Sequence, residues 1–243
     1  MYYVGCLPYF EPIFTETGAH PLAMARNTLK ILNALGIKPS VYEGEVCCGH
    51  DLYWTGNIEG FKKLAALNLE NIQKTGVKRI IFSCPECFYT YKILYPQFFK
   101  TVEVETVHMM QLLDEKIKKG ELKLGRLEGK FTFQDPCRLG RLLAIYDEPR
   151  RVLKSVKGLD LQCMEEIRKE SICCGSTHWV SCSSYTKQLQ KYRLGQAVDT
   201  GASTLLTACP KCQIHLSCAA KDLKTKMKIQ DYTEIIVQAM EQA

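Results

Sequence analysis

Cysteine spacing constrains this 243-residue chain more than any other feature of its sequence. A single cysteine, a Cys-Cys-Gly motif and a Cys-Pro-X-Cys motif follow one another in that order twice. Cys84 lies 36 residues after Cys48, and Cys209 lies 35 residues after Cys174. Ten of the 13 cysteines belong to these two sets, which are Cys6, Cys47, Cys48, Cys84 and Cys87, and then Cys137, Cys173, Cys174, Cys209 and Cys212. Two matching sets predict an internal repeat, and therefore a chain built from two related halves.

Apolar periodicity predicts that each copy of the repeat alternates short strands with single helices. In the first copy the expected strands are residues 1–5, 78–83 and 102–107, with an extended piece at 40–43 and helices at 22–35, 58–76 and 108–118. In the second copy the expected strands are residues 131–134, 203–208 and 227–230, with an extended piece at 159–163 and helices at 146–156, at 184–199 and after the N-cap residue Asp231. Strands that alternate with helices predict parallel sheets with right-handed crossovers.

We therefore expect an α/β fold of two βαβ-type halves related by a pseudo-twofold axis, residues 1–122 and 123–243. The glycine-containing stretch 118–130 is the expected linker. Each group of cysteines follows a predicted strand, and the carboxyl ends of parallel strands lie along one edge of a sheet. The loop, helix and strand between two groups return the chain to that edge. The five thiols of each half are thus expected to meet at one point.

Five converging thiols narrow the choice of metal. A structural zinc site takes four ligands, usually from two paired motifs, so each half offers one thiol too many. An ordinary cubane cluster also takes four cysteines, and the sequence lacks the tight run that commonly supplies them. Vicinal cysteines suit a larger iron–sulfur cluster, in which neighbouring thiolates reach different irons. The residues favour iron–sulfur binding and leave zinc, or unligated thiols and disulfides, as alternatives.

Composition indicates a globular, cytoplasmic protein. No apolar run reaches membrane-spanning length, and the first residues lack the basic and apolar regions of a secretory signal. A reducing cytosol disfavours disulfides, so the many cysteines indicate metal ligation. The net charge of +6 comes mainly from a mildly basic second half without a nucleic-acid-binding motif. We expect no nucleic-acid partner, and contact with a membrane only through another protein.

The repeated motifs resemble the CCG cysteine-rich motif of heterodisulfide reductases, found in their B-type subunit and in the C-terminal part of their D-type subunit. The residues that carry the resemblance are Cys47-Cys48-Gly49 with Cys84-Pro85-Glu86-Cys87, Cys173-Cys174-Gly175 with Cys209-Pro210-Lys211-Cys212, and the stretches 134–141 and 146–150. The resemblance covers nearly the whole chain. It implies that each complete set of five cysteines holds a noncubane [4Fe-4S] cluster, and that the two clusters together cleave a disulfide.

The resemblance implies an oxidoreductase subunit that acts on a sulfur group within a larger complex of anaerobic metabolism. The implied partners are a ferredoxin-like iron–sulfur subunit and a flavin-containing subunit. This chain would accept electrons from a partner's cubane clusters and would reduce or form a small-molecule or protein-borne disulfide. Because the first strand is expected at residue 2, without a preceding ferredoxin-like segment, the cubane clusters are expected on a partner. Similar subunits of anaerobic glycerol-3-phosphate dehydrogenase and of some succinate:quinone reductases suggest an alternative, an electron relay without its own substrate. A structural zinc protein is the third interpretation.

Several residues beside the motifs are candidates for supporting roles. His50 and His178 follow the two Cys-Cys-Gly motifs and could donate a hydrogen bond to cluster sulfur or a proton to a leaving thiolate, unless they cap helices or lie at the surface. The segment Ser176–Trp179 stands where relatives have a run of glycines, and its bulk is expected to narrow the approach to the second cluster. Trp54 and Trp179 are expected to shield the clusters from water.

The remaining candidates are weaker. Arg138 and Arg141 flank the cysteine that opens the second set, and a solvated basic face is favoured over attraction of an anionic thiol substrate. Cys163, Cys182 and Cys218 lie outside the repeat and are expected to be small buried apolar residues, although Cys182 could lie beside a cluster.

Overall fold

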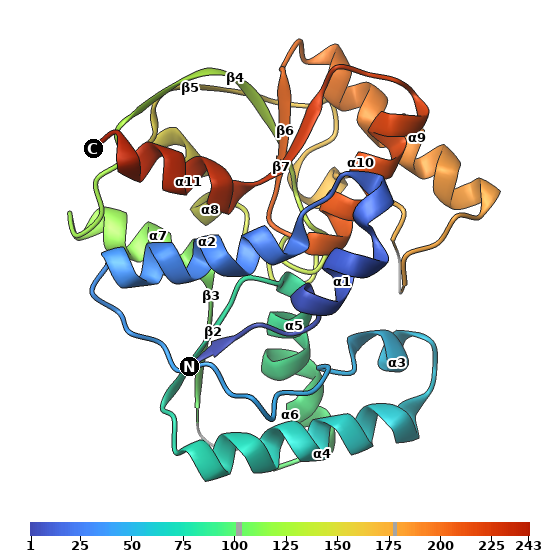
Figure 1. Ribbon diagram of the computed structural model, residues 1–243. Helices are drawn as coiled ribbons and strands as arrows, with labels where there is room; N and C mark the ends of the chain where they lie inside the picture. The colour runs from blue at the N-terminus through green and yellow to red at the C-terminus, as the bar shows by residue number, and fades with distance from the viewer. Residues whose placement is uncertain (101–103, 177–178) are drawn as a thin grey trace.

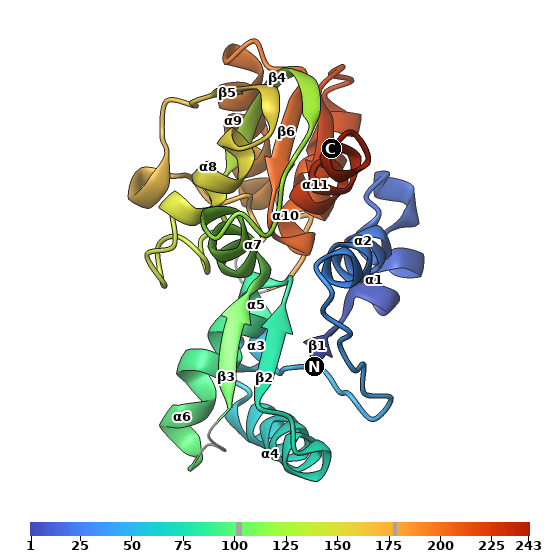
Figure 2. The same ribbon diagram turned by 90° about the vertical axis from the view of Figure 1, so that its left-hand side faces the viewer.

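Two parallel β-sheets form the framework of the chain, one for each copy of the repeat (Figure 1, Figure 2). The computed structural model describes residues 1–100, 104–176 and 179–243. The first sheet has the order β1-β2-β3, with strands at Tyr2–Tyr3, Arg79–Phe82 and Glu105–His108. The second sheet has the order β5-β4-β6-β7, with β4 at Arg126–Gln134, β5 at Lys157–Gln162, β6 at Thr204–Thr207 and β7 at Lys228–Asp231. All of these pairs are parallel, which confirms the predicted α/β class.

The strand order repeats as the cysteine spacing predicts. Strands β1, β2 and β3 correspond to β4, β6 and β7, and they pair in the same order. The counterpart of β5 is the predicted extended piece 40–43, which forms no strand in this fully described part of the chain. It contributes a backbone hydrogen bond of 2.9 Å, in which the N–H of Tyr2 donates to the carbonyl of Ser40. Part of the predicted strand 102–107 falls on residues 101–103, outside the described residues.

Six helices of the described chain lie where the apolar periodicity predicts them. They are α2 (Pro21–Ala34), α4 (Ile58–Thr75), α7 (Met109–Lys118), α8 (Asp147–Lys154), α9 (Ser184–Asp199) and α11 (Tyr232–Glu241). The predicted N-cap of α11 is confirmed, since the carboxylate of Asp231 accepts a hydrogen bond of 2.9 Å from the backbone N–H of Thr233.

The helices that the sequence analysis missed begin beside the cysteine motifs or continue such a helix. They are α1 (Leu7–Ile13), α3 (His50–Trp54), α5 (Pro85–Tyr89) with the π-helical Thr90–Leu94, α6 (Tyr95–Phe98) and α10 (Pro210–Asp222), besides short 3-10 turns at Thr15–Thr17 and Arg168–Glu170. Helices α5 and α10 begin at the proline of a Cys-Pro-X-Cys motif, because proline suits the first helical position. Within the described ranges, every helix is too short or too polar to cross a membrane.

The connection between the two sheets is shorter than predicted. The stretch 118–130 is expected to be a linker, but β4 begins at Arg126, which pairs with Lys157 of β5. The glycines of this stretch predict a linker, whereas Gly129 lies within β4 where the pairing register shifts. A glycine is well tolerated at such an irregularity, so it does not end the strand.

The two halves pack together through helices as well as through the cysteine-bearing loops. Helix α2 of the first half packs against α11 and α10 of the second, and α7 packs against α8. Figure 1 shows α2 and α11 running side by side, and Figure 2 shows α5 and α10 between the two sheets. One continuous core contains buried side chains from both halves, among them Leu32, Phe82, Leu206 and Ile236. The boundary at residues 122 and 123 stays a prediction.

Each Cys-Cys-Gly motif ends in a glycine with a backbone conformation that other residues rarely adopt. The φ angle is +81° at Gly49 and +92° at Gly175. A β-carbon at Gly49 would lie 3.0 Å from the ring of Phe61 in α4, and one at Gly175 would lie 3.0 Å from the backbone oxygen of Thr186 in α9. Helices α4 and α9 therefore pack directly on these glycines and fix the turns that present the two preceding cysteines.

Replacement of Gly175 by alanine tests this packing. Gly175→Ala is expected to lower the free energy of unfolding by about 1–3 kcal/mol, because alanine must adopt an unfavourable φ and also meets a backbone oxygen. Gly36→Ala is a matched control, since Gly36 has a φ of +71° but no atom within 4 Å of an added β-carbon. Chemical denaturation of both variants measures the difference. Equal losses of stability would contradict a role for the contact with Thr186.

A second contact between the halves centres on Asp114 in α7. Its carboxylate accepts two hydrogen bonds of 2.7 Å from Arg151 in α8 and one of 2.7 Å from Lys118. The carboxylate is 6% exposed. The hydrogen bond from Arg151 holds the pKa of Asp114 below its ordinary value. The ionised form therefore favours the packing of α7 on α8.

Asp114→Asn is expected to lower the free energy of unfolding by about 1–3 kcal/mol at pH 7, because charge-assisted hydrogen bonds are lost. The folded-state pKa is depressed, so this contribution exists above the unfolded-state pKa and disappears as the pH falls through the folded-state pKa. Denaturation curves should show that the difference in free energy of unfolding between Asp114→Asn and the unaltered protein is smaller in acid than at pH 7. Glu59→Gln, which removes an exposed carboxylate paired with Lys62, is the control, with an expected change below about 0.5 kcal/mol. If that difference is the same in acid as at pH 7, the ionised carboxylate of Asp114 makes no contribution to stability.

Candidate metal centres

The five cysteines of the first copy line a single pocket. They come from three places along one edge of the first sheet: the turn beyond β1, the loop before α3, and the end of β2 with the first turn of α5. Cys48, Cys84 and Cys87 are buried, and Cys6 and Cys47 are half-buried. The carboxyl ends of parallel strands thus bring together thiols that are up to 81 residues apart in the sequence.

The five cysteines of the second copy line a second pocket in the same way. They come from the turn beyond β4, the loop before α9, and the end of β6 with the first turn of α10. Burial repeats as well, because Cys174, Cys209 and Cys212 are buried while Cys137 and Cys173 are half-buried. The internal repeat therefore extends from the sequence to the exposure of each thiol.

Thiols within each pocket are close enough to share protons. The sulfur atoms of Cys6 and Cys47 lie 3.7 Å apart. This hydrogen bond raises the pKa of Cys6, and hydrogen bonds from Cys48 and Cys6 lower the pKa of Cys47. A hydrogen bond to Cys173, together with burial, raises the pKa of Cys137. Buried thiols this close cannot all ionise unless a positive charge compensates them, and a bound metal supplies that charge.

The donor set of each pocket fits an iron–sulfur cluster. Thiolate ligands select soft metals, namely iron in iron–sulfur clusters, zinc or copper(I). Five thiols exceed by one what a tetrahedral zinc ion or an ordinary cubane cluster takes. The cysteines of the described ranges form no disulfide bond with one another. The same five-thiol chemistry therefore exists twice, in two neighbouring pockets.

Two charged residues line both pockets, and each is the variable residue of a Cys-Pro-X-Cys motif. They are Glu86 in the first motif and Lys211 in the second. The Nζ atom of Lys211 lies 2.9 Å from Oε2 of Glu86 and also contacts Oδ1 of Asp51. Burial opposes a charge on Lys211, but the carboxylates of Glu86 and Asp51 outweigh burial and raise the pKa of Lys211 above its ordinary value. A buried ion cluster thus separates the two sets of cysteines.

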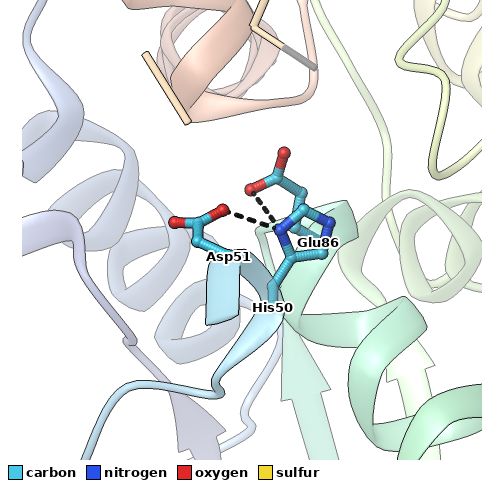
Figure 3. A group of neighbouring side chains, drawn as sticks. All are labelled: His50, Asp51 and Glu86. Atoms are coloured by element: carbon cyan, nitrogen blue, oxygen red, sulfur yellow. Dashed lines mark hydrogen bonds and ion pairs between the residues drawn. The ribbon is translucent and has the colours of Figure 1, made fainter. Parts of the chain in front are cut away.

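His50 joins this ion cluster from the start of α3 (Figure 3). Its Nδ1 lies 2.9 Å from Asp51 and 3.5 Å from Glu86. Its Nε2 accepts a hydrogen bond of 2.9 Å from Arg138, whose guanidinium lies 4.1 Å from the centre of the Trp54 ring. The proton of a neutral imidazole is therefore on Nδ1. The imidazole and two carboxylates are close enough to hold a metal ion, but a lysine ammonium already contacts both carboxylates.

Different side chains hold the two Cys-Cys-Gly loops. Around the first loop, Tyr95 and Asn68 donate hydrogen bonds of 2.9 Å and 3.1 Å to the backbone carbonyls of the two cysteines. Around the second, Gln134 donates a bond of 3.1 Å to the carbonyl just before the cysteines and accepts one from the buried Arg193. Burial lowers the pKa of Arg193 to about 10. An amide held by a guanidinium thus supports the second loop, whereas an amide and a phenol support the first.

The pockets bring together all ten cysteines that the sequence predicts as ligands, and their ligand role stays a prediction. Of the two candidate histidines, His50 is buried beside the first pocket, and His178 lies outside the described residues. The expectation of a solvated basic face is wrong for Arg138, which contacts His50 across the interface. Arg141 is exposed, and it donates hydrogen bonds to backbone carbonyls of residues 169 and 171.

Ser176 and Trp179 are the described residues of the segment 176–179 that follows the second Cys-Cys-Gly motif. Ser176 lines the second pocket. The ring of Trp179, however, lies 6.0 Å from that of Phe10, which lines the first pocket, and 5.3 Å from Nζ of Lys211. The indole of Trp179 thus lies beside one residue of the first pocket, Phe10, and beside Lys211, which lines both pockets, while Thr177 and His178 lie outside the described residues.

The three cysteines outside the repeat line neither pocket. Cys163 and Cys182 are exposed, so the expectation of small buried residues is wrong for these two, and Cys218 is half-buried. Sequence reasoning missed the ion cluster entirely. The available signal was the pair of opposite charges, Glu86 and Lys211, at the same position of the two motifs.

Comparison with known proteins identifies relatives of the chain. It is 32% identical to the D-type subunit of the dihydromethanophenazine:CoB–CoM heterodisulfide reductase of Methanosarcina barkeri, in an alignment that covers 99% of this chain and 58% of the relative. It is 29% identical to the EtfAB:quinone oxidoreductase of Syntrophomonas wolfei, over 98% of this chain and 34% of that protein. It is 30% identical to the B-type subunit of a CoM/CoB fumarate reductase of Methanothermobacter marburgensis, over 77% of this chain and 37% of that protein.

The resemblance inferred from the motifs is confirmed by a family model, described as a cysteine-rich domain, that matches residues 1–92 and 131–217. Each matched range contains one complete set of five cysteines. The chain spans little more than half of the heterodisulfide reductase subunit that it matches. With both copies matched, the chain belongs to the CCG cysteine-rich domain family.

Proposed function

We propose that the chain is an iron–sulfur subunit of a heterodisulfide-reductase-like oxidoreductase that binds two [4Fe-4S] clusters of the noncubane type. The observation that carries the proposal is the presence of two neighbouring pockets, each lined by five thiols. The ligands would be Cys6, Cys47, Cys48, Cys84 and Cys87 in the first pocket, and Cys137, Cys173, Cys174, Cys209 and Cys212 in the second. The relation to a heterodisulfide reductase of Methanosarcina barkeri supports it.

The reaction proposed is reduction of a disulfide, in which two electrons and two protons convert one S–S bond into two thiols, or the reverse. The clusters would supply electrons and an iron site for sulfur. The chain itself places the two cysteine sets on either side of a buried ion cluster, so that one substrate sulfur can face each set. His50, with Nδ1 directed at Asp51 and Nε2 at Arg138, is fixed in orientation beside the first pocket.

The partners proposed are a ferredoxin-like iron–sulfur subunit, with cubane clusters that deliver electrons, and a flavin-containing subunit. The substrate would be a small-molecule or protein-borne disulfide, and any membrane contact would be made by a partner in a cytoplasmic complex. The relative in Methanosarcina barkeri is named as one subunit of its reductase, which supports partner chains.

A second candidate function is an electron relay between a dehydrogenase and a quinone or other acceptor, without a substrate of its own. The relation to an EtfAB:quinone oxidoreductase favours this alternative. We prefer disulfide chemistry because electron transfer needs only four cysteines around a cubane cluster, whereas both five-cysteine sets are complete here.

Metal analysis of anaerobically purified protein tests the cofactor. Two four-iron clusters predict about eight iron atoms per chain. Cys48→Ser and Cys174→Ser should each lose about half of the iron, because each removes a ligand from one pocket. Cys163→Ser is the control, since this thiol is exposed and lies outside both pockets. Stoichiometric zinc with little iron would refute the proposal.

Spectroscopy separates the catalyst from the relay. A substrate disulfide or its thiol products should change the electron paramagnetic resonance spectrum of the half-oxidised clusters. Cys174→Ser should abolish disulfide reduction while the partner's cubane clusters are still reduced. The relay is established instead if a panel of disulfides leaves the spectrum unchanged and electrons still reach a quinone or a dye.

A further inference from the structure

The variable residue of each Cys-Pro-X-Cys motif lies at the interface between the halves, where it lines the pocket of the other half. Lys211 comes from the second motif and lines the first pocket, and Glu86 comes from the first motif and lines the second. Each also lines the pocket of its own half. Among the described residues, these two side chains are the ones shared by both pockets, so a change in either reaches both sets of cysteines.

Contacts on several sides hold the ammonium group of Lys211 in place. It lies 2.9 Å from Glu86, contacts Asp51, and lies 5.3 Å from the centre of the Trp179 ring. The side chain of Lys211 is 2% exposed. Water and salt screen a buried charge poorly, so its field extends farther than that of a surface lysine. The charge of Lys211 therefore contributes to the field at both thiol sites, together with the carboxylates of Glu86 and Asp51.

Such a charge affects electron transfer in a predictable direction. Reduction adds negative charge to a cluster that thiolates already make anionic, and the net charge around a cluster is one of the factors that set its reduction potential. A nearby cation favours reduction, and a nearby anion opposes it. Two other cations, Arg138 and Arg193, also belong to the second half. Arg138 lines the second pocket but not the first, whereas Lys211 lines both.

We propose that Lys211 is a positioning residue for both metal centres, which joins the halves through Asp51 and Glu86 and raises the reduction potentials of both clusters together. The proposal rests on the cluster content proposed above. The ammonium group of Lys211 would then influence two sites whose cysteines come from separate halves of the chain.

The test is a redox titration of the intact iron-loaded protein, followed by electron paramagnetic resonance and visible absorption. Lys211→Met removes the charge and keeps an unbranched side chain, and both midpoint potentials should shift to more negative values. Lys211→Arg keeps the charge, so its two midpoint potentials should lie closer to those of the unaltered protein than the potentials of Lys211→Met do. Lys221→Met is the matched control, because Lys221 lies on the same helix but is exposed and outside both pockets.

Glu86→Gln keeps the test decisive if Lys211→Met does not fold, since loss of one member of a buried ion pair can be strongly destabilising. It removes a negative charge beside both pockets and leaves Lys211 in contact with Asp51. Both potentials should then shift to more positive values. A shift of one cluster alone, or of neither, in protein with the iron content of the unaltered chain overturns the proposal. Iron-free unaltered protein would instead overturn the proposed function on which it rests.

Discussion

Parallel pairing of a few very short strands is the constraint on which the candidate sites depend. Strand β1 spans only Tyr2–Tyr3, and β2 and β6 span four residues each. Because paired parallel strands end on the same edge, each pair delivers two separate cysteine groups to one place. The glycines of the Cys-Cys-Gly motifs then let a third group turn back onto that edge beneath the following helix. The sites follow from backbone geometry before any metal is considered.

The sequence predicted the repeat, the parallel α/β class and six of the helices. Helix α9 was predicted at its observed bounds, Ser184–Asp199, although its buried face is largely polar and includes Gln190 and Arg193. Helices α3 and α5 were missed because five residues are too few for a periodic pattern. The linker was overestimated because glycines in 118–130 resemble a loop, while pairing with β5 draws residues 126–130 into a strand.

The convergence of the ten cysteines could be predicted because spacing and strand order suffice for it. The ion cluster between the pockets could not, because it depends on how the two halves face each other. Glu86 and Lys211 each look like a surface charge within its own motif, and only the packing of the halves buries them against each other. The contact of Arg138 with His50 and that of Trp179 with Phe10 were unpredictable for the same reason, because each joins residues of different halves.

The packing of α2 against α11 has a consequence for biosynthesis. These helices are about 200 residues apart in the sequence, so the first half cannot bury α2 fully until residues 232–241 have been made. Contacts of such long range delay folding, and incompletely packed intermediates expose apolar surface in the meantime. The residues shared by the two pockets also come from both halves, so neither thiol site is fully enclosed before the second half has folded. Translation of the second half therefore precedes completion of either thiol site.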